Sequence, residues 1–542
     1  MIINITSCSK NESNVKSALQ SETTRMEDHV YTEVGLRKYN PPIEVHFVRE
    51  LTDSLQGLLD NLPDETLNNN RWSNLFEEVL GVHMNNEWVE SGEIFALKLN
   101  HTISSGEIPD IIKVNADQLR ILYNDGLIED LTQVYEEYAT PLTKAIFSQE
   151  GNAAFDLATM AGNLMAIPVT GSSIEEATYI WIRTDWLDSL GLEAPRTIDD
   201  LLKISKAFTT KDPDQNGEDD TYGLMLSNYL WDPIADMEGF MAGFDAFPRL
   251  WVEDESGKLV FGGIQPEVKA ALQELQKMYK NGEIENEFYY KNGTDVKEMV
   301  VQGKLGMFYG EQGSSSFLEE SRKFDKQAEW QAFPIVSGAK ESAKVPLKYS
   351  TSEFFAVKKG FEHPEVIVKL INLYLEKVWG DTAEFDTYHS NPLPVWQLSP
   401  VSPYPARKNL EAFRQIDYAR KNGDMSQLTI QAKHIQTFIE KYLKDSVESF
   451  WGWERTYGEN GAFAILDQYE QNGQFLYDKF TGPPTATMLE RESFLVDLQH
   501  ETYFDIILGN PIDEFDNFIE KWNKLGGEQI TKEVNAWYTH NK

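Results

Sequence analysis

The sequence predicts an α/β fold, because strand-like patterns alternate along the chain with helix-like patterns. Residues 43–48 alternate apolar and polar side chains, as a half-buried strand does. Residues 303–310 and 354–357 are rich in apolar and aromatic side chains, which is typical of buried strands. At 542 residues the chain is too long for one compact core. We therefore expect an α/β protein with two large lobes.

The first elements follow in a regular order. A helical pattern covers residues 72–80, a second strand candidate covers 81–88, and residues 105–112 form a turn that leads into a short buried strand. Thr197 and Asp200 approximate a capping box, and the helix that they begin keeps one face small or apolar. This helix leads directly into a loop rich in acidic residues.

The later elements are mostly helices. Pro266 suits the first position of a helix, and Gly282 suits its end. Residues 364–374 form another helical pattern, and the chain from about residue 409 is mainly helical. No repeat of 20–50 residues is present, so solenoids and propellers are set aside.

The charge of the chain argues against two kinds of partner. There are 49 Lys and Arg residues against 87 Asp and Glu, a formal net charge of −38. Such a chain repels a phosphate backbone and an anionic membrane surface, so we expect no nucleic-acid partner. No apolar run reaches the ~18 residues that a membrane helix needs, so any membrane attachment must be covalent.

Residues 212–223 place oxygen-bearing side chains in the order that a calcium loop of EF-hand type needs. Gly217 supplies the sharp turn, and position 12 is Gly223 instead of the bidentate Glu. We therefore predict a rigid structural Ca²⁺ site and not a switch. The alternative is an acidic, solvated turn. The predicted ligands are Asp212, Asp214, Asn216, the carbonyl of Glu218, and Asp220.

The single cysteine, Cys8, excludes disulfides within the chain and a zinc cluster of thiolates. Residues 5–8 resemble the end of a bacterial lipoprotein signal, although only seven residues precede the cysteine. Residues 9–40 are polar and carry little apolar periodicity, as a tether would. We expect a lipid anchor on Cys8, and the alternative is an unstructured start with an incidental cysteine.

Five segments taken together resemble one protein family. They are Ser-Gly-Glu-Ile-Pro-Asp at 105–110, Ile-Arg-Thr-Asp-Trp-Leu-Asp-Ser-Leu-Gly-Leu at 182–192, Asp-Thr-Tyr-Gly at 220–223, Gly-Pro-Pro-Thr-Ala-Thr-Met at 482–488 and Leu-Gly-Gly-Glu-Gln-Ile-Thr at 525–531. The chain resembles the extracellular solute-binding proteins of family 1, the lipoprotein receptors of ATP-driven carbohydrate importers in Gram-positive bacteria. The last two segments resemble its branch of large lipoproteins.

The resemblance implies a two-lobed, type II periplasmic-binding-protein fold with hinge strands crossing between the lobes. Residues 41–178 and 350–405 would form the N-terminal lobe, and 179–349 with 406–542 the C-terminal lobe, after a tether at 1–40. It also implies an oligosaccharide bound in a cleft that closes around it, without catalysis. The implied partners are the membrane permease subunits of an ABC importer, and the implied state is an extracellular, lipid-anchored monomer.

Enzyme motifs are mostly absent. There is no Gly-x-Ser-x-Gly elbow, no His-Glu-x-x-His and no Walker loop. A glycoside hydrolase or lyase remains the alternative, because two carboxylates need only converge in space. A surface adhesin without a small ligand is a third possibility.

Sugar recognition needs flat aromatic faces and planar polar groups, and sites in open α/β sheets form beyond the carboxyl ends of strands. Because Gly452 separates two large rings, residues 451–455 suit a cleft wall. Each aromatic has the alternative of core packing, and Arg49 that of a salt bridge. Arg183 and Asp185 are expected to form a structural pair. The predicted ligand contacts are Arg49, Asn115, Asp117, Trp231, Tyr309, Glu311, Trp396, Trp451, Trp453 and Arg455.

Overall fold

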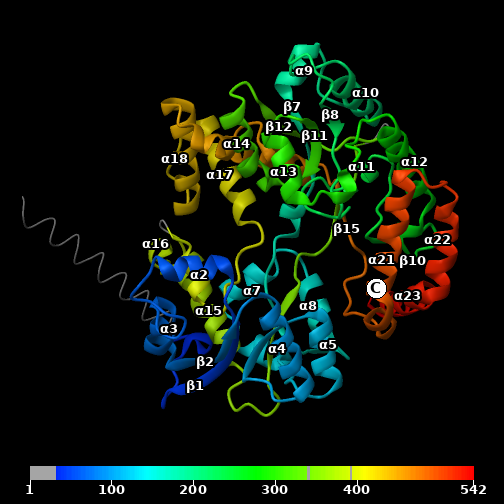
Figure 1. Cartoon of the computed structure of the whole chain (residues 1–542). Helices are drawn as coiled ribbons and strands as arrows, with labels where there is room; N and C mark the ends of the chain where they lie inside the picture. The colour runs from blue at the N-terminus through cyan, green and yellow to red at the C-terminus, as the bar shows by residue number, and fades with distance from the viewer. Residues whose placement is uncertain (1–31, 339–341, 391–392, 542) are drawn as a thin grey trace, which may run out of the picture. The chain divides into compact units, whose positions relative to one another are not determined.

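The computed structural model describes residues 32–338, 342–390 and 393–541, so Cys8 and most of the predicted tether lie outside the described residues (Figure 1). The chain divides into two compact units. Unit 1 combines the described residues up to Gly171 with Thr351–Ala406, and unit 2 combines Ser172–Ser350 with residues from Arg407 onward. The chain therefore passes between the units three times. No helix within the described ranges is both long and apolar enough to span a membrane.

Unit 1 contains three small sheets, the shortest of which pairs β4 (Thr159–Met160) with β5 (Asn163–Leu164). β1 (Ile43–Glu50) and β2 (Val82–Glu90) pair in parallel. In the third sheet, β14 (Glu353–Val357) lies between β3 (Ile111–Asn115) and β6 (Ile167–Pro168) and is antiparallel to both. Four of the five residues of β14 are buried. Because β14 comes from the second chain segment of unit 1, both segments are needed to build its core.

Helix α15 (Val366–Trp379) is buried along almost its whole length. Its buried amide Asn372 donates hydrogen bonds to the carbonyls of Gly35 (2.9 Å) and Tyr138 (2.8 Å) and accepts one from Thr143 Oγ1 (2.6 Å). These bonds satisfy a polar group that burial would otherwise penalise. The other helices of unit 1 are α2 (Asp53–Asp60), α3 (Arg71–Leu75), α4 (Gly92–Ser105), α5 (Ala116–Asn124), α6 (Thr132–Tyr138), α7 (Pro141–Phe147), α8 (Ala153–Ala158) and α16 (Phe385–Tyr388).

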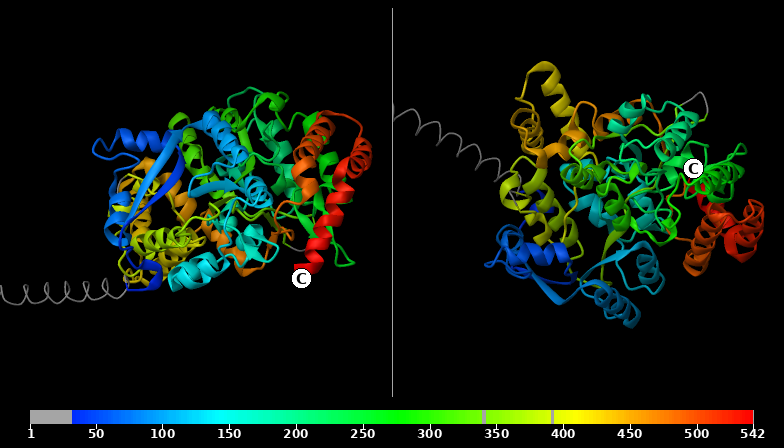
Figure 2. Two further views of the ribbon diagram at one scale, coloured as in Figure 1. Left: turned by 90° about the horizontal axis from the view of Figure 1, so that it is seen from below. Right: turned by 45° about the horizontal axis from the view of Figure 1, so that its top comes forward.

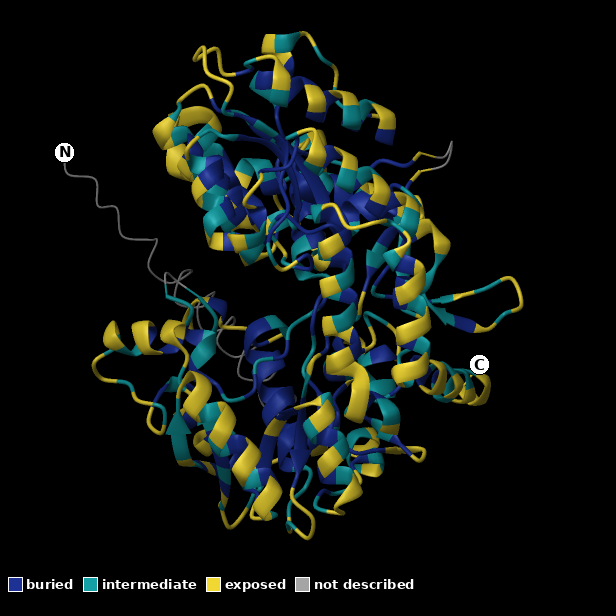
Figure 3. Cartoon of the chain, turned by 45° about the vertical axis from the view of Figure 1, so that its right-hand side comes forward, coloured by how far each residue is buried: buried dark blue, intermediate teal, exposed yellow. Residues whose placement is uncertain are grey.

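Unit 2 is built around a four-stranded sheet in the order β12-β7-β11-β8. Its strands are β7 (Tyr179–Arg183), β8 (Tyr222–Leu224), β11 (Leu305–Gly310) and β12 (Trp330–Phe333). β7 and β11 are buried at every residue, as the apolar sequence of 303–310 predicts (Figure 3). β7 belongs to this sheet, so the first crossing lies in the segment before it. The short pairs β9 (Trp251–Glu253) with β10 (Leu259–Phe261) and β13 (Val345–Leu347) with β15 (Phe475–Tyr477) complete the strands.

The helices of unit 2 cover the sheet and form a C-terminal layer in which α21 packs against α12 and α22 (Figures 1 and 2). Apart from β15, the described chain from residue 408 onward is helical or loop, as the sequence predicts. The helices are α9 (Thr184–Leu190), α10 (Ile198–Thr210), α11 (Glu238–Ala242), α12 (Pro266–Lys280), α13 (Gly293–Val301), α14 (Ser315–Phe324), α17 (Lys408–Asn422), α18 (Ile430–Asp445), α19 (Trp451–Tyr457), α20 (Ala462–Gln471), α21 (Ala486–Leu508), α22 (Glu514–Trp522) and α23 (Glu528–Asn541).

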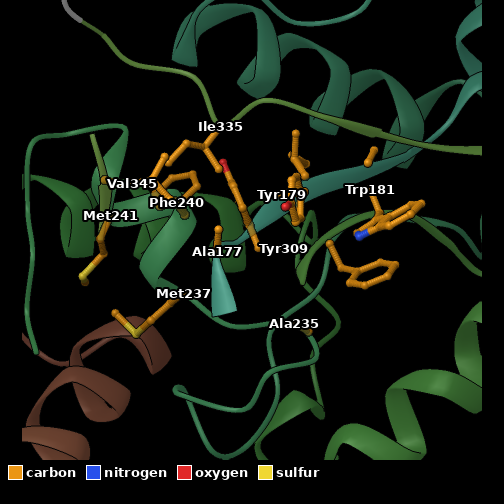
Figure 4. Packing of buried hydrophobic residues seen from close by; sticks show 14 of the residues in the cluster. Ala177, Tyr179, Trp181, Ala235, Met237, Phe240, Met241, Tyr309, Ile335 and Val345 are labelled. Carbon is orange, nitrogen blue, oxygen red and sulfur yellow. The ribbon is translucent and has the colours of Figure 1, made fainter. Parts of the chain in front are cut away.

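The core of unit 2 places α11 directly against β11 (Figure 4). A Cβ atom on Gly239 of α11 would lie 2.3 Å from the ring of Tyr309, so only glycine allows this close approach. The pair predicted from sequence is also present: Arg183 Nε donates to Asp185 Oδ1 at 2.8 Å, and the Arg183 side chain is 1% exposed. Both features fix the sheet beneath the loops that follow β8 and β11.

Candidate functional site

Unit 2 contains a cavity of about 170 Å³ beyond the ends of β11 and β13, which we call the unit 2 pocket. The loop after β8 reaches it because Ile234 forms a β-bridge with Gly310, and Asp232 Oδ1 accepts a hydrogen bond from the Ile234 amide at 3.0 Å. Trp231 and Glu311, both predicted from the sequence, line this pocket together. Its lining residues are Glu176, Thr178, Trp231, Asp232, Pro233, Asp236, Glu238, Arg249, Leu250, Glu311, Pro346, Leu347 and Lys348.

Trp231 is held rigidly in the wall of the unit 2 pocket. Its side chain is 7% exposed and its ring packs edge-on against Tyr503, with centroids 6.1 Å apart. The guanidinium of Arg249 lies 5.6 Å from the Trp231 ring and is itself fixed by Glu238 at 2.9 Å. Trp231 therefore offers the pocket only a small part of its surface.

Two carboxyl groups of the pocket are shifted toward their protonated forms. Burial, followed by the charges of Glu176 and Asp232, raises the pKa of Glu311 to about 7. Burial and then the charge of Glu238 raise the pKa of Asp236 to about 7, even though its carboxylate accepts bonds from Thr178 Oγ1 and the Gly239 amide. Perturbed carboxyl groups gathered in a cavity are typical of binding or catalytic sites.

Tyr229 is a candidate contact that the sequence analysis missed. Its side chain is 51% exposed and its ring stacks on His500, with centroids 5.9 Å apart. It lies in the same turn as the pocket residue Asp232, whose amide donates to the Tyr229 carbonyl at 2.8 Å. The sequence feature that could have identified Tyr229 is its place as an aromatic residue two positions before Trp231 in the same loop.

Unit 1 contains a cavity of about 320 Å³ at the end of β1, which we call the unit 1 pocket. Two predicted residues, Arg49 and Trp396, meet in its lining. The indole of Trp396 stacks on His389, with centroids 6.5 Å apart, and an ion pair between Lys113 and Glu353 (2.9 Å) forms part of the wall. This pocket therefore combines an aromatic ring with groups that can hydrogen-bond to hydroxyls.

Arg49 has a positioning role in this pocket. Its guanidinium donates to the carbonyls of Leu398 (2.8 Å), Ser399 (3.0 Å) and Gln397. Burial lowers the pKa of Arg49 to about 10, so the group stays charged at neutral pH. Arg49 therefore donates to three backbone carbonyls instead of forming the salt bridge considered as the alternative. These bonds fix the segment that carries Trp396.

Asn115 and Asp117 are not among the residues that line the unit 1 pocket. Asn115 caps α5: its Oδ1 accepts from the Gln118 amide at 2.9 Å, and Gln118 Oε1 accepts from the Asn115 amide at 3.1 Å. Asp117 lies in the first exposed turn of the same helix, where its charge complements the helix dipole. Helix capping explains both residues in this structure.

Tyr309 and the segment 451–455 differ from the prediction. Tyr309 is fully buried in β11 and presents no face to a ligand. Residues 451–457 form helix α19, so Gly452 does not give a flexible wall. Trp451 points inward and is fully buried, whereas Trp453, two positions on, is 37% exposed and stacks on Tyr457.

Arg455 is also engaged within α19 and its neighbours. It pairs with Glu329 at 3.0 Å and with Glu454 at 3.1 Å, and its guanidinium lies 5.4 Å from the Trp451 ring. Neither α19 tryptophan nor Arg455 lines the unit 1 pocket or the unit 2 pocket. The local interaction of these residues is structural.

The predicted calcium loop brings its acidic side chains toward one amide. Asn216 Nδ2 donates to Asp214 Oδ2 (2.9 Å) and Asp220 Oδ1 (3.2 Å), and Asp212 accepts from the amides of Asn216 (3.0 Å) and Gly217 (3.1 Å). Partial desolvation, the side chain of Asp212 and the charge of Asp220 raise the pKa of Asp214. The carboxylates thus repel one another, as they do in a loop suited to a cation.

Two observations bear on whether Ca²⁺ fits this loop. Among the residues that the structure describes, no group of three or more His, Cys, Asp or Glu side chains is drawn together at metal-binding distances. A Cβ on Gly223 would lie 2.3 Å from the carbonyl oxygen of Ser205, so no glutamate can occupy position 12. The donor set of Asp212, Asp214, Asn216 and Asp220 fits Ca²⁺ chemically, with amide donors between the carboxylates in this structure.

The family model of the bacterial extracellular solute-binding proteins matches residues 50–380. The chain belongs to this family. That assignment agrees with the resemblance found in its sequence segments. Solute-binding proteins are receptors, so membership of this family does not support an enzymatic function.

Among curated relatives, the polygalacturonan/rhamnogalacturonan-binding protein YtcQ of Bacillus subtilis is 24% identical over 80% of this chain and 82% of its own length. An HMO-binding solute-binding protein of Bifidobacterium longum infantis has a TM-score of 0.60 at 18% identity, covering 92% of this chain and 98% of that one. An EF-hand mutant of FusA from Streptococcus pneumoniae, in complex with fructo-nystose, has a TM-score of 0.56 at 17% identity, covering 92% and 99%. These likenesses confirm the predicted type II solute-binding-protein fold.

Proposed function

We propose that this protein is an extracellular receptor that binds an oligosaccharide and delivers it to the permease subunits of an ABC importer. The unit 2 pocket carries the proposal, because it sets Trp231 beside carboxyl groups that can accept hydroxyl hydrogen bonds. Within the described residues, the Glu311 carboxylate has no hydrogen bond or ion pair of its own. The names of YtcQ, the HMO-binding protein and FusA with fructo-nystose agree with a carbohydrate ligand.

The proposed contacts follow from the pocket linings. In unit 2, Glu311 and Asp232 accept hydroxyl bonds and Trp231 contacts a sugar ring, while Tyr229 supplies an exposed face nearby. In unit 1, Trp396 is the aromatic contact and Arg49 holds its segment in place. At about 170 Å³ the unit 2 pocket is smaller than the roughly 300–1,000 Å³ of drug-sized sites, so it holds part of an oligosaccharide.

Incubation with defined plant, host and bacterial oligosaccharides tests the proposal. We expect at least one to raise the melting temperature in a concentration-dependent way, because a ligand that binds only the native state stabilises it. Chromatography of the same mixtures should find the sugar unchanged. Failure of every carbohydrate in the set to bind by calorimetry would overturn the proposal.

A carbohydrate-active enzyme is the second candidate, on one observation. A carboxyl group with a pKa of about 7, as at Glu311, suits a general acid, and Asp232 lines the same pocket as a possible second carboxylate. The chromatographic arm separates the two functions. Product that forms with the wild-type protein and not with Glu311→Gln would favour the enzyme.

We further propose that Ca²⁺ is held by the side chains of Asp212, Asp214, Asn216 and Asp220 and the carbonyl of Glu218. The EF-hand mutation named for the FusA structure agrees with a calcium loop in this fold. When bound, the ion would neutralise the repelling carboxylates. Its role is structural, because the loop follows α10 and lies outside both pockets.

The proposed anchor is a lipid on Cys8 of a monomeric receptor, with a tether shorter than the predicted 9–40, because Gly35 and Leu36 are buried in unit 1. The support is the pattern of residues 5–8 and the polar sequence that follows. Membrane fractionation of the native host, compared with a Cys8→Ser strain, tests it. Release of the variant into the medium is expected, and equal membrane retention of both proteins would contradict the anchor.

A further inference from the structure

We infer that the unit 2 pocket selects an uncharged sugar unit and discriminates against a uronate, so that this receptor takes neutral oligosaccharide in preference to acidic oligosaccharide. The inference rests on the proposed function and adds the ligand class. It departs from the polygalacturonan ligand in the name of YtcQ, which is a polyuronate.

The charges that line the pocket carry the inference. Five carboxyl side chains face two cationic ones, a formal charge of −3 within a cavity of about 170 Å³. Arg249 is already paired with Glu238 at 2.9 Å and lies against the Trp231 ring, so its charge is compensated within the wall. Three further carboxyl groups, those of Asp232, Asp236 and Glu311, outnumber the one remaining cation, Lys348.

Lys348 is the group that could favour a uronate. It lines the pocket together with Arg249, and the charges of Asp478 and Glu238 act on its ammonium. Although its side chain reaches the surface, burial and then the charge of Arg249 lower the pKa of Lys348, so the site disfavours the charged form that a uronate would need. This one ammonium does not offset the carboxyl groups of Asp232, Asp236 and Glu311 in the wall of the same cavity.

The environment of Glu311 indicates the electrostatic field that a ligand carboxylate would meet in this pocket. Burial and then the charges of Glu176 and Asp232 together raise the pKa of Glu311 to about 7. A uronate placed beside Glu311 would face the same neighbours and Glu311 itself. A hydroxyl group at that position instead donates a hydrogen bond to a carboxylate, which is among the stronger hydrogen bonds in proteins.

Matched ligands test the selection directly. Oligogalacturonides are compared with their methyl esters and their carboxyl-reduced counterparts, which keep chain length and linkage and remove the charge. Alginate oligomers with their reduced counterparts, and neutral plant oligosaccharides, complete the set, measured by calorimetry at 150 mM salt as a chosen condition of roughly physiological ionic strength. We expect the uncharged member of each binding pair to bind at least about tenfold more tightly.

The outcomes separate the inference from the function. Equal or tighter binding of the acidic member would overturn the inference and leave the receptor function standing. If no carbohydrate in the set binds, both fall together. Preference for the uncharged member supports both.

Variants tie the selection to the pocket. Glu311→Gln keeps a side chain of the same size and one acceptor oxygen but removes the charge, so the ratio between ester and acid affinities should shrink by about tenfold. Asp232→Asn should change the ratio in the same direction. Glu255→Gln is the matched control, because Glu255 is exposed in the turn between β9 and β10 and makes the same change of charge outside the pocket. An unchanged ratio in both pocket variants, with normal melting temperatures, would contradict the inference.

Discussion

The exposed ring of Tyr229 packs on a second aromatic ring, and this support makes it a good surface for a sugar to stack on. His500 stacks beneath it at 5.9 Å, so little side-chain freedom is lost when a ligand binds. We predict that Tyr229→Ala lowers oligosaccharide affinity about threefold to tenfold, which corresponds to about 0.5–1.5 kcal/mol for one aromatic contact. Calorimetry with a ligand identified by the thermal screen measures the change.

Tyr290→Ala is the control for this prediction. Tyr290 is 73% exposed, but it contacts Tyr289 and lies outside the lining of the unit 2 pocket. Its removal should leave affinity unchanged. Equal losses in both variants would assign the effect to general surface hydrophobicity and contradict the role of Tyr229.

Arg49 provides a stability prediction at the same scale. A lysine keeps the charge but replaces a fork of donors with one ammonium, so it cannot reach the three carbonyls of residues 397–399 together. We expect Arg49→Lys to lower the free energy of unfolding by about 1–3 kcal/mol in urea titrations. Arg196→Lys, at a side chain that is 84% exposed, should cost almost nothing. A cost of similar size at both positions would contradict the positioning role.

Asp236 should make the stability of the protein depend on pH. Its pKa is raised in the folded state to about 7 from the usual value near 4. The folded state therefore binds this proton more tightly than the unfolded state, and stability falls as pH rises from about 4 to about 7. We expect Asp236→Asn, which stays neutral, to gain about 1–3 kcal/mol relative to wild type between pH 5 and pH 8.

Unfolding in urea at the two pH values measures this gain. Asp64→Asn removes an exposed carboxylate and should follow the wild-type pH dependence. Parallel pH profiles for Asp236→Asn and wild type would show that the Asp236 proton does not contribute.

For single residues, the sequence predicted which residue types belong to a pocket better than it predicted the direction in which each side chain points. Trp231, Glu311, Arg49 and Trp396 were found because they follow strands or lie in a distinctive segment, and the structure places them in pockets. Tyr309 follows the same rule but points into the core, because the face to which a side chain in a strand points depends on packing partners from distant parts of the sequence.

At the scale of elements, local signals located most boundaries. Pro266 begins α12, and Thr197 Oγ1 accepts from the Asp200 amide at 3.2 Å at the start of α10. The flexible wall expected at 451–455 is instead the rigid helix α19, which is set by contacts with α14 and α18 that no local pattern reveals. The order of strands in the larger sheets was likewise beyond the sequence pattern, since pairing joins segments as distant as β3 and β14.

The calcium loop provides the prediction at this scale. We expect a chelator to lower the melting temperature, and Ca²⁺ to restore it, because the ion relieves repulsion among the carboxylates of Asp212, Asp214 and Asp220. Asp214→Asn should reduce this Ca²⁺ response. Asp219→Asn is the matched control, because Asp219 lies in the same loop outside the proposed ligand set. A metal analysis without calcium, together with equal melting temperatures with and without chelator, would contradict the site.

For the whole molecule, we expect ligand binding and stability to be linked quantitatively. Above the Kd, each tenfold increase in free oligosaccharide should add about 1.4 kcal/mol to the free energy of unfolding. Differential scanning calorimetry across a ligand series measures this slope. A melting temperature that stays constant while calorimetry detects binding would mean that the ligand also binds the unfolded chain.

The two-unit organisation follows from chain length and from the resemblance more than from local pattern. The structure divides the chain after Gly171, Ser350 and Ala406, close to the expected divisions after 178, 349 and 405. Periodicity alone does not give these positions, because the crossing segments resemble ordinary loops. The family resemblance supplied the number of crossings.

The interleaved order of the two units has a consequence for how the chain is made. Synthesis from the N-terminus produces β3 and β6 long before β14, the strand that joins them, since all of Ser172–Ser350 comes between. Until β14 emerges, the first segment carries unpaired strand edges and an uncovered apolar surface, which are aggregation hazards. Unit 2 is likewise incomplete until α17 to α23 have been synthesised. Neither core can close until most of the polypeptide exists, so we expect the chain to remain incompletely folded during most of its synthesis.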